Sequence, residues 1–279
     1  MSGCYDAVLL NEFTNFIWVT MHYEINQDID HVYVLTVKTF TDRIAHVEKE
    51  MAKHAIPYTF FYEHLIPHLE KDLETKFTPN MIRRSYKANV LQHIALWEDA
   101  IKNGYQRILV FEDDVILNKN FKRYFERIMR DVKNLKEDYV VFLGGADTKV
   151  PDGFFLEKGE LYSLPIATSE GLIMDIEGIK RRLAWTKVNK IHCPIDHLIA
   201  YIDQEQKAQS YWSRVPLTEQ ASINGDLKSK IDDHRLKHSL YIVKLRYNWN
   251  KFHRRQARPF IVKPKYFFWG VLKKLGLAH

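Results

Sequence analysis

Three adjacent carboxylates, Glu112, Asp113 and Asp114, are the residues of this sequence whose types and spacing most directly suggest chemistry. They separate two apolar runs, 108–111 and 115–117, of the kind that form buried strands, where an unpaired charge is costly to desolvate. Because side chains alternate along an extended chain, Glu112 and Asp114 should face one side and Asp113 the other. Two carboxylates so close together favour a bound cation, and all-oxygen ligation favours Mg²⁺ or Mn²⁺. The alternative is a solvated loop in which one carboxylate caps the following helix.

The segments around this triplet alternate between strand and helix patterns. Apolar residues recur at i, i+4, i+7 and i+11 from Val90, and Gly104 follows where a helix cap belongs. The expected elements are strand 32–37, helix 42–55, strand 56–65, loop 70–87, helix 88–104, strand 105–111, helix 120–135 and strand 139–145. This order predicts an α/β fold with a mainly parallel sheet flanked by helices. Ligands bind such sheets outside the carboxyl ends of the strands, where the triplet and Gly144-Gly145 fall.

The composition is that of an ordinary globular protein, with 46% hydrophobic and 27% charged residues among 279. The two cysteines, Cys4 and Cys193, provide no disulfide framework and favour a reducing compartment. No apolar run is long enough for a spanning helix. Residues 5–23 are expected to form an amphipathic helix and not a signal peptide. These features together predict a cytoplasmic protein.

The positive charge of the chain is concentrated at its C-terminal end. Residues 234–279 carry twelve Lys/Arg and no Asp or Glu, while the whole chain has a net charge of +6. Aromatic residues, including the run 266–269, are interspersed with these cations. Such a mixture favours contact with an anionic membrane, and a peripheral location on the inner face of the cytoplasmic membrane is expected. Two alternatives to membrane contact remain for this segment. It could bind nucleic acid, although nucleic acid is not the expected partner, or it could pack on the acidic remainder of the chain.

Four blocks of the sequence resemble glycosyltransferase family 25, which includes bacterial lipooligosaccharide galactosyltransferases. They are "VYVLTVKTFTDR", "LQHIALWEDAIKNGYQRILVFEDDVIL", "CPIDHL" and "VPLTEQASINGDLKSKI", within residues 31–231. The resemblance implies a GT-A-like, Rossmann-type fold and inverting transfer of a sugar from a nucleotide donor. It also suggests an N-terminal extension (1–30), a glycosyltransferase domain (31–233) and a basic aromatic segment (234–279). The chain departs from the family pattern at Gln92, where Ser is usual, and at Ser85-Tyr86, where Gly-Glu is usual.

The resemblance also implies roles for individual residues. Glu112 and Asp114 would hold the metal ion, and inversion requires a base that accepts the proton of the acceptor hydroxyl. Asp196, in the Pro-x-Asp block, is the first candidate for the base, although an acid in the first turn of a helix is also favoured by the helix dipole. Asp147 and Glu170 are the other candidates for the base. The residues expected at the donor are Thr36, Arg43, His93, Glu112 and Asp113; for Arg43 and His93, purely structural roles are the alternatives.

The sequence therefore predicts a metal-dependent, inverting glycosyltransferase. The expected donor is a UDP-sugar, with galactose the favoured sugar, and the expected acceptor is lipooligosaccharide or another surface glycan or glycolipid. A protein that binds an anionic surface or nucleic acid without catalysis, its acidic loop being structural, is the competing hypothesis. A Mg²⁺-dependent phosphotransfer enzyme lacks a supporting motif, and a receiver domain would place its acidic pair nearer the start of the domain. Loops 66–88 and 146–165 are expected to determine specificity.

Overall fold

A computed structural model of the chain describes residues 23–62, 75–79, 82–166, 168–224, 226–227 and 239–275. The amphipathic helix predicted for residues 5–23 lies, except for its last residue, outside the described residues. The same holds for residues 66–74 and 80–81 of the predicted loop 66–88. None of the described helices combines the length and the apolar character that crossing a bilayer requires.

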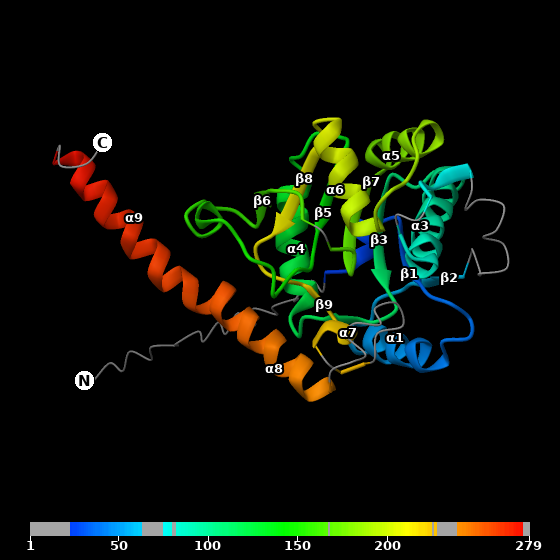
Figure 1. The fold of residues 1–279 in the computed structure, drawn as a ribbon, viewed down its shortest axis with the longest axis horizontal. Helices are drawn as coiled ribbons and strands as arrows, with labels where there is room; N and C mark the ends of the chain where they lie inside the picture. Colours follow the sequence, from blue (N-terminus) through cyan, green and yellow to red (C-terminus); the bar gives the residue numbers. More distant parts are fainter. Residues whose placement is uncertain are drawn as a thin grey trace, which may run out of the picture.

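The predicted alternation of strands and helices is present along the chain (Figure 1). The strands are β1 (His31–Leu35), β2 (Thr59–Phe61), β3 (Arg107–Glu112), β4 (Val115–Leu117), β5 (Tyr139–Phe142), β6 (Leu161–Ser163), β7 (Gly171–Asp175), β8 (Gln209–Ser213) and β9 (Thr218–Gln220). The helices are α1 (Thr41–His54), α3 (Arg84–Lys102), α4 (Phe121–Val132), α5 (Ile176–Val188), α6 (Ile195–Glu205), α7 (Ala221–Asn224), α8 (Leu240–Lys251) and α9 (Arg258–Lys274). Short 3₁₀ turns, η1 (Ile25–Gln27) and η3 (Asp152–Phe155), and a π-helical turn, η5 (Phe252–Ala257), complete the described elements.

Seven strands form the central sheet in the order β2-β1-β3-β7-β5-β8-β6. β2, β1 and β3 are parallel, as are β5 and β8, whereas β7 runs antiparallel to both of its neighbours and β6 runs antiparallel to β8. Five of the seven strands therefore point the same way, which confirms the mainly parallel sheet. The reversal of β7 was not predicted, and it places the beginning of β7 beside the end of β3, where Gly171 pairs with Phe111.

Helices cover both faces of the sheet because its strands are apolar on both sides. Along β3, Ile108 and Val110 enter one buried cluster, whereas Leu109 and Phe111 enter the other. The first cluster is completed by residues of α3, α5 and α6, and the second by residues of α1 and α4. A strand that is buried on both faces has a continuous run of apolar residues in its sequence. This is the pattern that precedes the acidic triplet.

The predicted helix boundaries hold to within a few residues, with one correction. α3 begins at Arg84, so residues 84–87 are helical and not part of the predicted loop 70–87. The first turn of α3 is polar and only partly buried, and its sequence therefore lacks the apolar periodicity that identifies the rest of the helix. Gly104 adopts a φ of +74°, the left-handed conformation expected of a residue that ends a helix.

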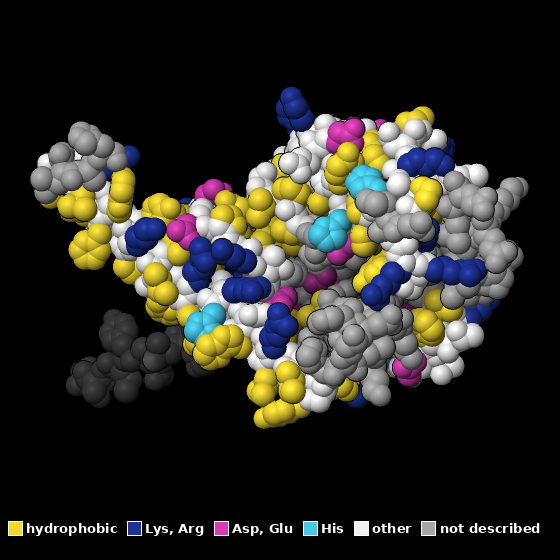
Figure 2. Space-filling model, viewed as in Figure 1, with side chains coloured by type: hydrophobic (Ala, Val, Ile, Leu, Met, Phe, Trp, Pro, Cys, Tyr) yellow, Lys and Arg dark blue, Asp and Glu magenta, His cyan; other side chains and the backbone are white. Residues whose placement is uncertain are grey.

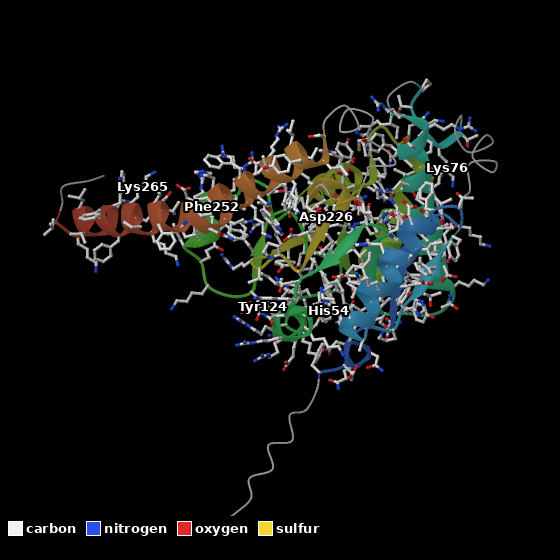
Figure 3. All side chains as sticks on the ribbon, turned by 90° about the horizontal axis from the view of Figure 1, so that it is seen from below. His54, Lys76, Tyr124, Asp226, Phe252 and Lys265 are labelled. Atoms are coloured by element: carbon white, nitrogen blue, oxygen red, sulfur yellow. The ribbon has the colours of Figure 1, made fainter. Side chains whose placement is uncertain are left out.

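The C-terminal segment is helical and follows the domain before extending beyond it. α8, η5 and α9 form one long rod, whose last part projects from the domain (Figure 1). Seen from below, Phe252 lies near the domain and Lys265 lies on the projecting part (Figure 3). Phe268 and Leu272 lie in α9, and Leu275 is the residue that caps it.

Candidate active site

The acidic triplet lies at the carboxyl end of β3, an interior strand of the central sheet. Glu112 is the last residue of β3 and pairs with Leu35, the last residue of β1. Asp113 and Asp114 form the turn into β4, and both are buried. The carboxylates therefore stand at the edge of the sheet where ligands of α/β proteins bind, as the sequence predicts.

Asp113 is held by two residues from the neighbouring strand and helix. The Thr36 hydroxyl, just after β1, donates a hydrogen bond of 2.8 Å to Asp113 Oδ2. Arg43, in the first turn of α1, forms a buried ion pair with Asp113 Oδ1. The structure thus brings together three of the residues expected at the donor, and it leaves Asp113 committed to protein partners.

Glu112 points into a different set of side chains, as the alternation along the chain predicts. Ser169 Oγ donates to Glu112 Oε1 at 2.7 Å, and Gln220 Nε2 donates to Glu112 Oε2 at 2.7 Å. Burial, followed by the negative charge of Asp114, raises the pKa of Glu112 above its ordinary value. The sequence attached no chemistry to Gln220 and did not identify Ser169, because their proximity to Glu112 depends on strand pairing.

Asp114 has one carboxylate oxygen without a partner. Its side chain is only 4% exposed, Oδ2 lies 3.8 Å from Nη1 of Arg43, and Oδ1 is buried with no hydrogen-bond partner among the described residues. A buried acceptor without a donor is costly, so such an atom in a native site points to a ligand, an ion or a water molecule. Asp114 is therefore the member of the triplet best placed to bind something that the chain itself does not supply.

Glu170 adds a further carboxylate to this site. It immediately precedes β7 and is buried, and Oε1 accepts a hydrogen bond of 2.7 Å from the Gly145 amide. Burial is the main cause that raises the pKa of Glu170 to about 8, and the charges of Glu112 and Asp114 act in the same direction. The antiparallel course of β7 produces this proximity, because the start of β7 lies beside the end of β3.

The other two candidate bases, Asp196 and Asp147, act electrostatically on different parts of the protein. Asp196 is in the first turn of α6, as predicted, is partly buried, and contributes to the raised pKa of Glu112. Asp147 follows β5, and its charge acts on Arg255 and Tyr247 of the C-terminal segment. The structure therefore associates Asp196 with the triplet and Asp147 with the C-terminal rod.

His93 and Gln92 differ in what they contact. His93 is fully enclosed, neither ring nitrogen has a hydrogen-bond partner among the described residues, and burial lowers its pKa to about 3. In this conformation the neutral ring of His93 has no exposed surface with which to contact a nucleotide-sugar donor. Gln92 Nε2 instead donates to the carbonyl oxygens of Thr36 at 2.8 Å and Phe61 at 3.0 Å. Gln92, a departure from the family pattern, thus ties the ends of β1 and β2 together beside the site.

The carboxylate oxygens at this site can be compared with the ligands that a divalent cation requires. Glu112, Asp114 and Glu170 lie within mutual electrostatic reach, and Asp114 offers an unpartnered oxygen. No group of three or more His, Cys, Asp or Glu residues in the described part of the chain is arranged to hold a metal on its own. Mg²⁺ commonly uses one or two carboxylates together with water and substrate phosphates, and so the residues present fit an ion that is delivered with a diphosphate.

The surface of the domain is hollowed on the face shown in Figure 2. Acidic side chains lie inside the hollow, and histidine, lysine and arginine side chains lie around it (Figure 2). Together, the sheet and the carboxylates at its edge define an α/β protein with a cluster of buried carboxylates at the carboxyl end of β3.

Comparison with known proteins finds a family that this region resembles. Residues 29–150 match the family described as glycosyltransferase family 25 (LPS biosynthesis protein). The match includes α3, the triplet and all the contacts of Asp113, and it confirms the resemblance predicted from the sequence blocks.

Individual relatives align over a similar region. A putative glycosyltransferase of Haemophilus influenzae is 34% identical over 104 residues, which cover 34% of this chain and 36% of that protein. The lipooligosaccharide biosynthesis protein lic2B of the same species is 32% identical over 97 residues, covering 33% and 36%. The chain thus spans about a third of the length of these curated relatives. Mouse xyloside xylosyltransferase 1 is a structural match at a TM-score of 0.38 and 13% identity, covering 64% of this chain and 83% of that one.

Proposed function

We propose that this protein is a metal-dependent, inverting glycosyltransferase that transfers a sugar from a UDP-sugar to a surface glycan. The observation that carries the proposal is the buried carboxylate cluster at the end of β3, with its unpartnered Asp114 oxygen, inside the segment that matches family 25. Galactose is the proposed sugar. Lipooligosaccharide is the proposed acceptor, because a relative that matches the same region is named as a lipooligosaccharide biosynthesis protein. The proposed domain is of the GT-A type and comprises residues 31–233.

Asp114, with Glu112, would hold Mn²⁺ or Mg²⁺. When bound, this cation supplies Lewis-acid stabilisation of the charge that develops on the leaving nucleoside diphosphate. Glu112 is oriented for that role by Ser169 and Gln220, which contact both of its carboxylate oxygens. Asp113 has a different task, since its bonds to Thr36 and Arg43 fix the turn that presents Asp114.

Asp196 is the proposed base. It lies at the start of α6, partly exposed, and is close enough to affect Glu112 electrostatically, and both features suit a group that accepts the proton of an acceptor hydroxyl. Glu170 suits this role less well, since a carboxyl whose pKa is about 8 is largely protonated near neutral pH. We assign to Glu170 a structural role, because it is enclosed and bonded to the Gly145 amide.

The test is a transfer assay with Asp114→Asn, supported by ligand screening. Nucleotide sugars are first screened by thermal shift with and without Mn²⁺, since a ligand that binds the native state raises the melting temperature. Asp114→Asn is expected to lower Mn²⁺-dependent transfer by roughly 100-fold or more, while Glu126→Gln, an exposed change on α4, leaves it unaltered.

One outcome would favour the non-enzymatic alternative. A mouse relative, 32% identical over 85 residues, is named an inactive glycosyltransferase 25 family member, and these residues cover 29% of this chain and 14% of that protein. Wild-type protein that neither binds nor hydrolyses any UDP-sugar in the presence of Mn²⁺, while remaining folded, would reject the proposed transfer.

A further inference from the structure

The C-terminal arm, which we define as residues 239–275, attaches to the domain along one side. Tyr247 and Lys251 both contact Glu219, and Arg258 Nη2 lies 2.7 Å from Asp152 Oδ1. Val262 continues this side and is only 3% exposed. These residues follow one another at spacings of four, seven and four residues, so they form a single stripe that faces the domain.

Between these contacts, the π-helical turn η5 joins the arm to the loop after β5. Arg254 donates to the carbonyl oxygen of Asp147, and Arg255 Nη2 donates to that of Gly145 at 2.8 Å. The guanidinium of Arg255 also lies 4.2 Å from the centre of the Trp212 ring. The same loop carries the amide that binds Glu170, and the arm is therefore fastened directly beside the candidate active site.

The opposite side of the arm is apolar and exposed. Phe260, Phe267 and Val271 of α9 and its cap Leu275 follow at i, i+7, i+11 and i+15, which places them on one helical face. Phe260 is 82% exposed and Phe267 is 70% exposed. Other exposed apolar residues of the arm, on this face and beside it, are Leu240, Tyr241, Ile242, Leu245, Trp249, Phe252, Ile261, Tyr266, Phe268, Trp269 and Leu272. An exposed apolar surface of this extent is typical of a docking surface.

The charges around this face favour a lipid surface over another protein. Lys263, Lys273 and Lys274 are exposed on α9, and the sequence from 234 to 279 contains no acidic residue. Lysine is depleted in protein interfaces, whereas lysines bordering a face rich in Phe, Trp and Leu are typical of helices that lie on anionic membranes. Each lysine near such a membrane adds favourable electrostatic energy.

We propose that the outer face of the C-terminal arm docks on an anionic lipid bilayer and lies in its interface. α9 is about 25 Å long at 1.5 Å per residue, and none of the described helices is long and apolar enough to span. Because the inner side of the same arm is bonded to Gly145, Asp147 and Glu219, docking would also fix the orientation of the acidic site relative to the membrane. This inference does not depend on the proposed sugar transfer.

Flotation of the full chain with lipid vesicles tests the docking. Vesicles of phosphatidylcholine with and without phosphatidylglycerol are compared at low and high salt. The wild-type protein is expected to float with the anionic vesicles at low salt, and Phe267→Ser/Phe268→Ser is expected to lower the partition coefficient by roughly tenfold or more. Val188→Ser is the matched control, since Val188 is an exposed apolar residue of α5, outside the arm, and should not affect partition.

Two further measurements keep the result interpretable. Lys273→Gln/Lys274→Gln should weaken binding to anionic vesicles and leave the small binding to neutral vesicles unchanged. Light scattering after size exclusion reports self-association. Equal partition of the wild type and the double Ser variant would overturn the proposal. A dimer of the wild type that the Ser variant abolishes, without vesicle binding, would assign the face to a second copy and overturn it as well.

Discussion

Arg43, near the start of α1, forms a buried ion pair with Asp113 in the turn after β3. These residues are 70 positions apart in sequence, and their contact joins the first helix of the domain to the acidic turn. The Thr36 hydroxyl supplies a second bond to the same carboxylate. This arrangement holds the backbone from which Asp114 projects.

Removal of either partner of this pair should destabilise the protein strongly. Arg43→Ala or Asp113→Ala leaves a buried charge uncompensated, and the expected loss in the free energy of unfolding is about 3–5 kcal/mol. Urea denaturation measures it. Arg130→Ala, which removes an exposed ion pair with Glu126, is the control and should cost less than about 1 kcal/mol. A loss of similar size at both sites would contradict the structural role of Arg43.

The position of the Glu170 side chain should require glycine at position 144. A Cβ atom at position 144 would lie 1.9 Å from Glu170 Oε1 and 2.2 Å from its Cδ, so alanine there displaces a buried carboxyl group. Gly144→Ala is expected to cost about 1–3 kcal/mol. In a Glu170→Ala background the same substitution should cost much less, since the carboxyl group is gone. Denaturation of the single and double variants measures this coupling, and additive losses would show that the two residues are independent.

The raised pKa of Glu170 predicts how stability depends on pH. A carboxyl that is protonated in the folded state up to about pH 8 but ionises near pH 4.5 when unfolded contributes stability at low pH. That contribution is lost as the pH rises from about 5 to about 8. In metal-free protein, Glu170→Gln should therefore remove a slope of up to about 1.4 kcal/mol per pH unit. The Glu112 carboxyl, whose pKa is also raised, should add a slope of the same sign.

Unfolding free energies at several pH values, with a chelator and then with Mn²⁺, check this dependence. Manganese should stabilise the wild type more at pH 8 than at pH 6, because the cation competes with protons for the same carboxylates. Identical slopes for the wild type and Glu170→Gln would mean that Glu170 does not titrate as its burial implies.

Arg255 should couple the C-terminal arm to the active site. Its side chain lies over Trp212 and donates to Gly145, and so Arg255→Met retains an apolar contact with the ring but loses the hydrogen bond to the loop. We expect a reduced kcat for transfer, with vesicle partition unchanged, because the outer face of the arm is intact. Arg246→Met, an exposed arginine on α8, is the matched control. A fall in partition alone, with normal kcat, would contradict this coupling.

Several parts of the site were accessible from sequence because they follow one another along the chain. The apolar run 108–111 ending in three carboxylates predicted a buried strand with an acidic end, and β3 and its turn have that form. The apolar periodicity from Val90 predicted α3, and the Pro-x-Asp block predicted the first turn of α6. Such patterns report which side of an element is buried, and this is a local property.

Only the tertiary structure decided which distant residues meet. The reversal of β7 brings Ser169 and Glu170 to the end of β3, yet its apolar sequence would suit either strand direction. The full enclosure of His93 and the binding of η5 to the loop after β5 also depend on packing between elements far apart in the chain. The sequence determined where strands end and where charge accumulates, whereas strand pairing and depth of burial determined which carboxylates share a site, because those depend on contacts that no local spacing encodes.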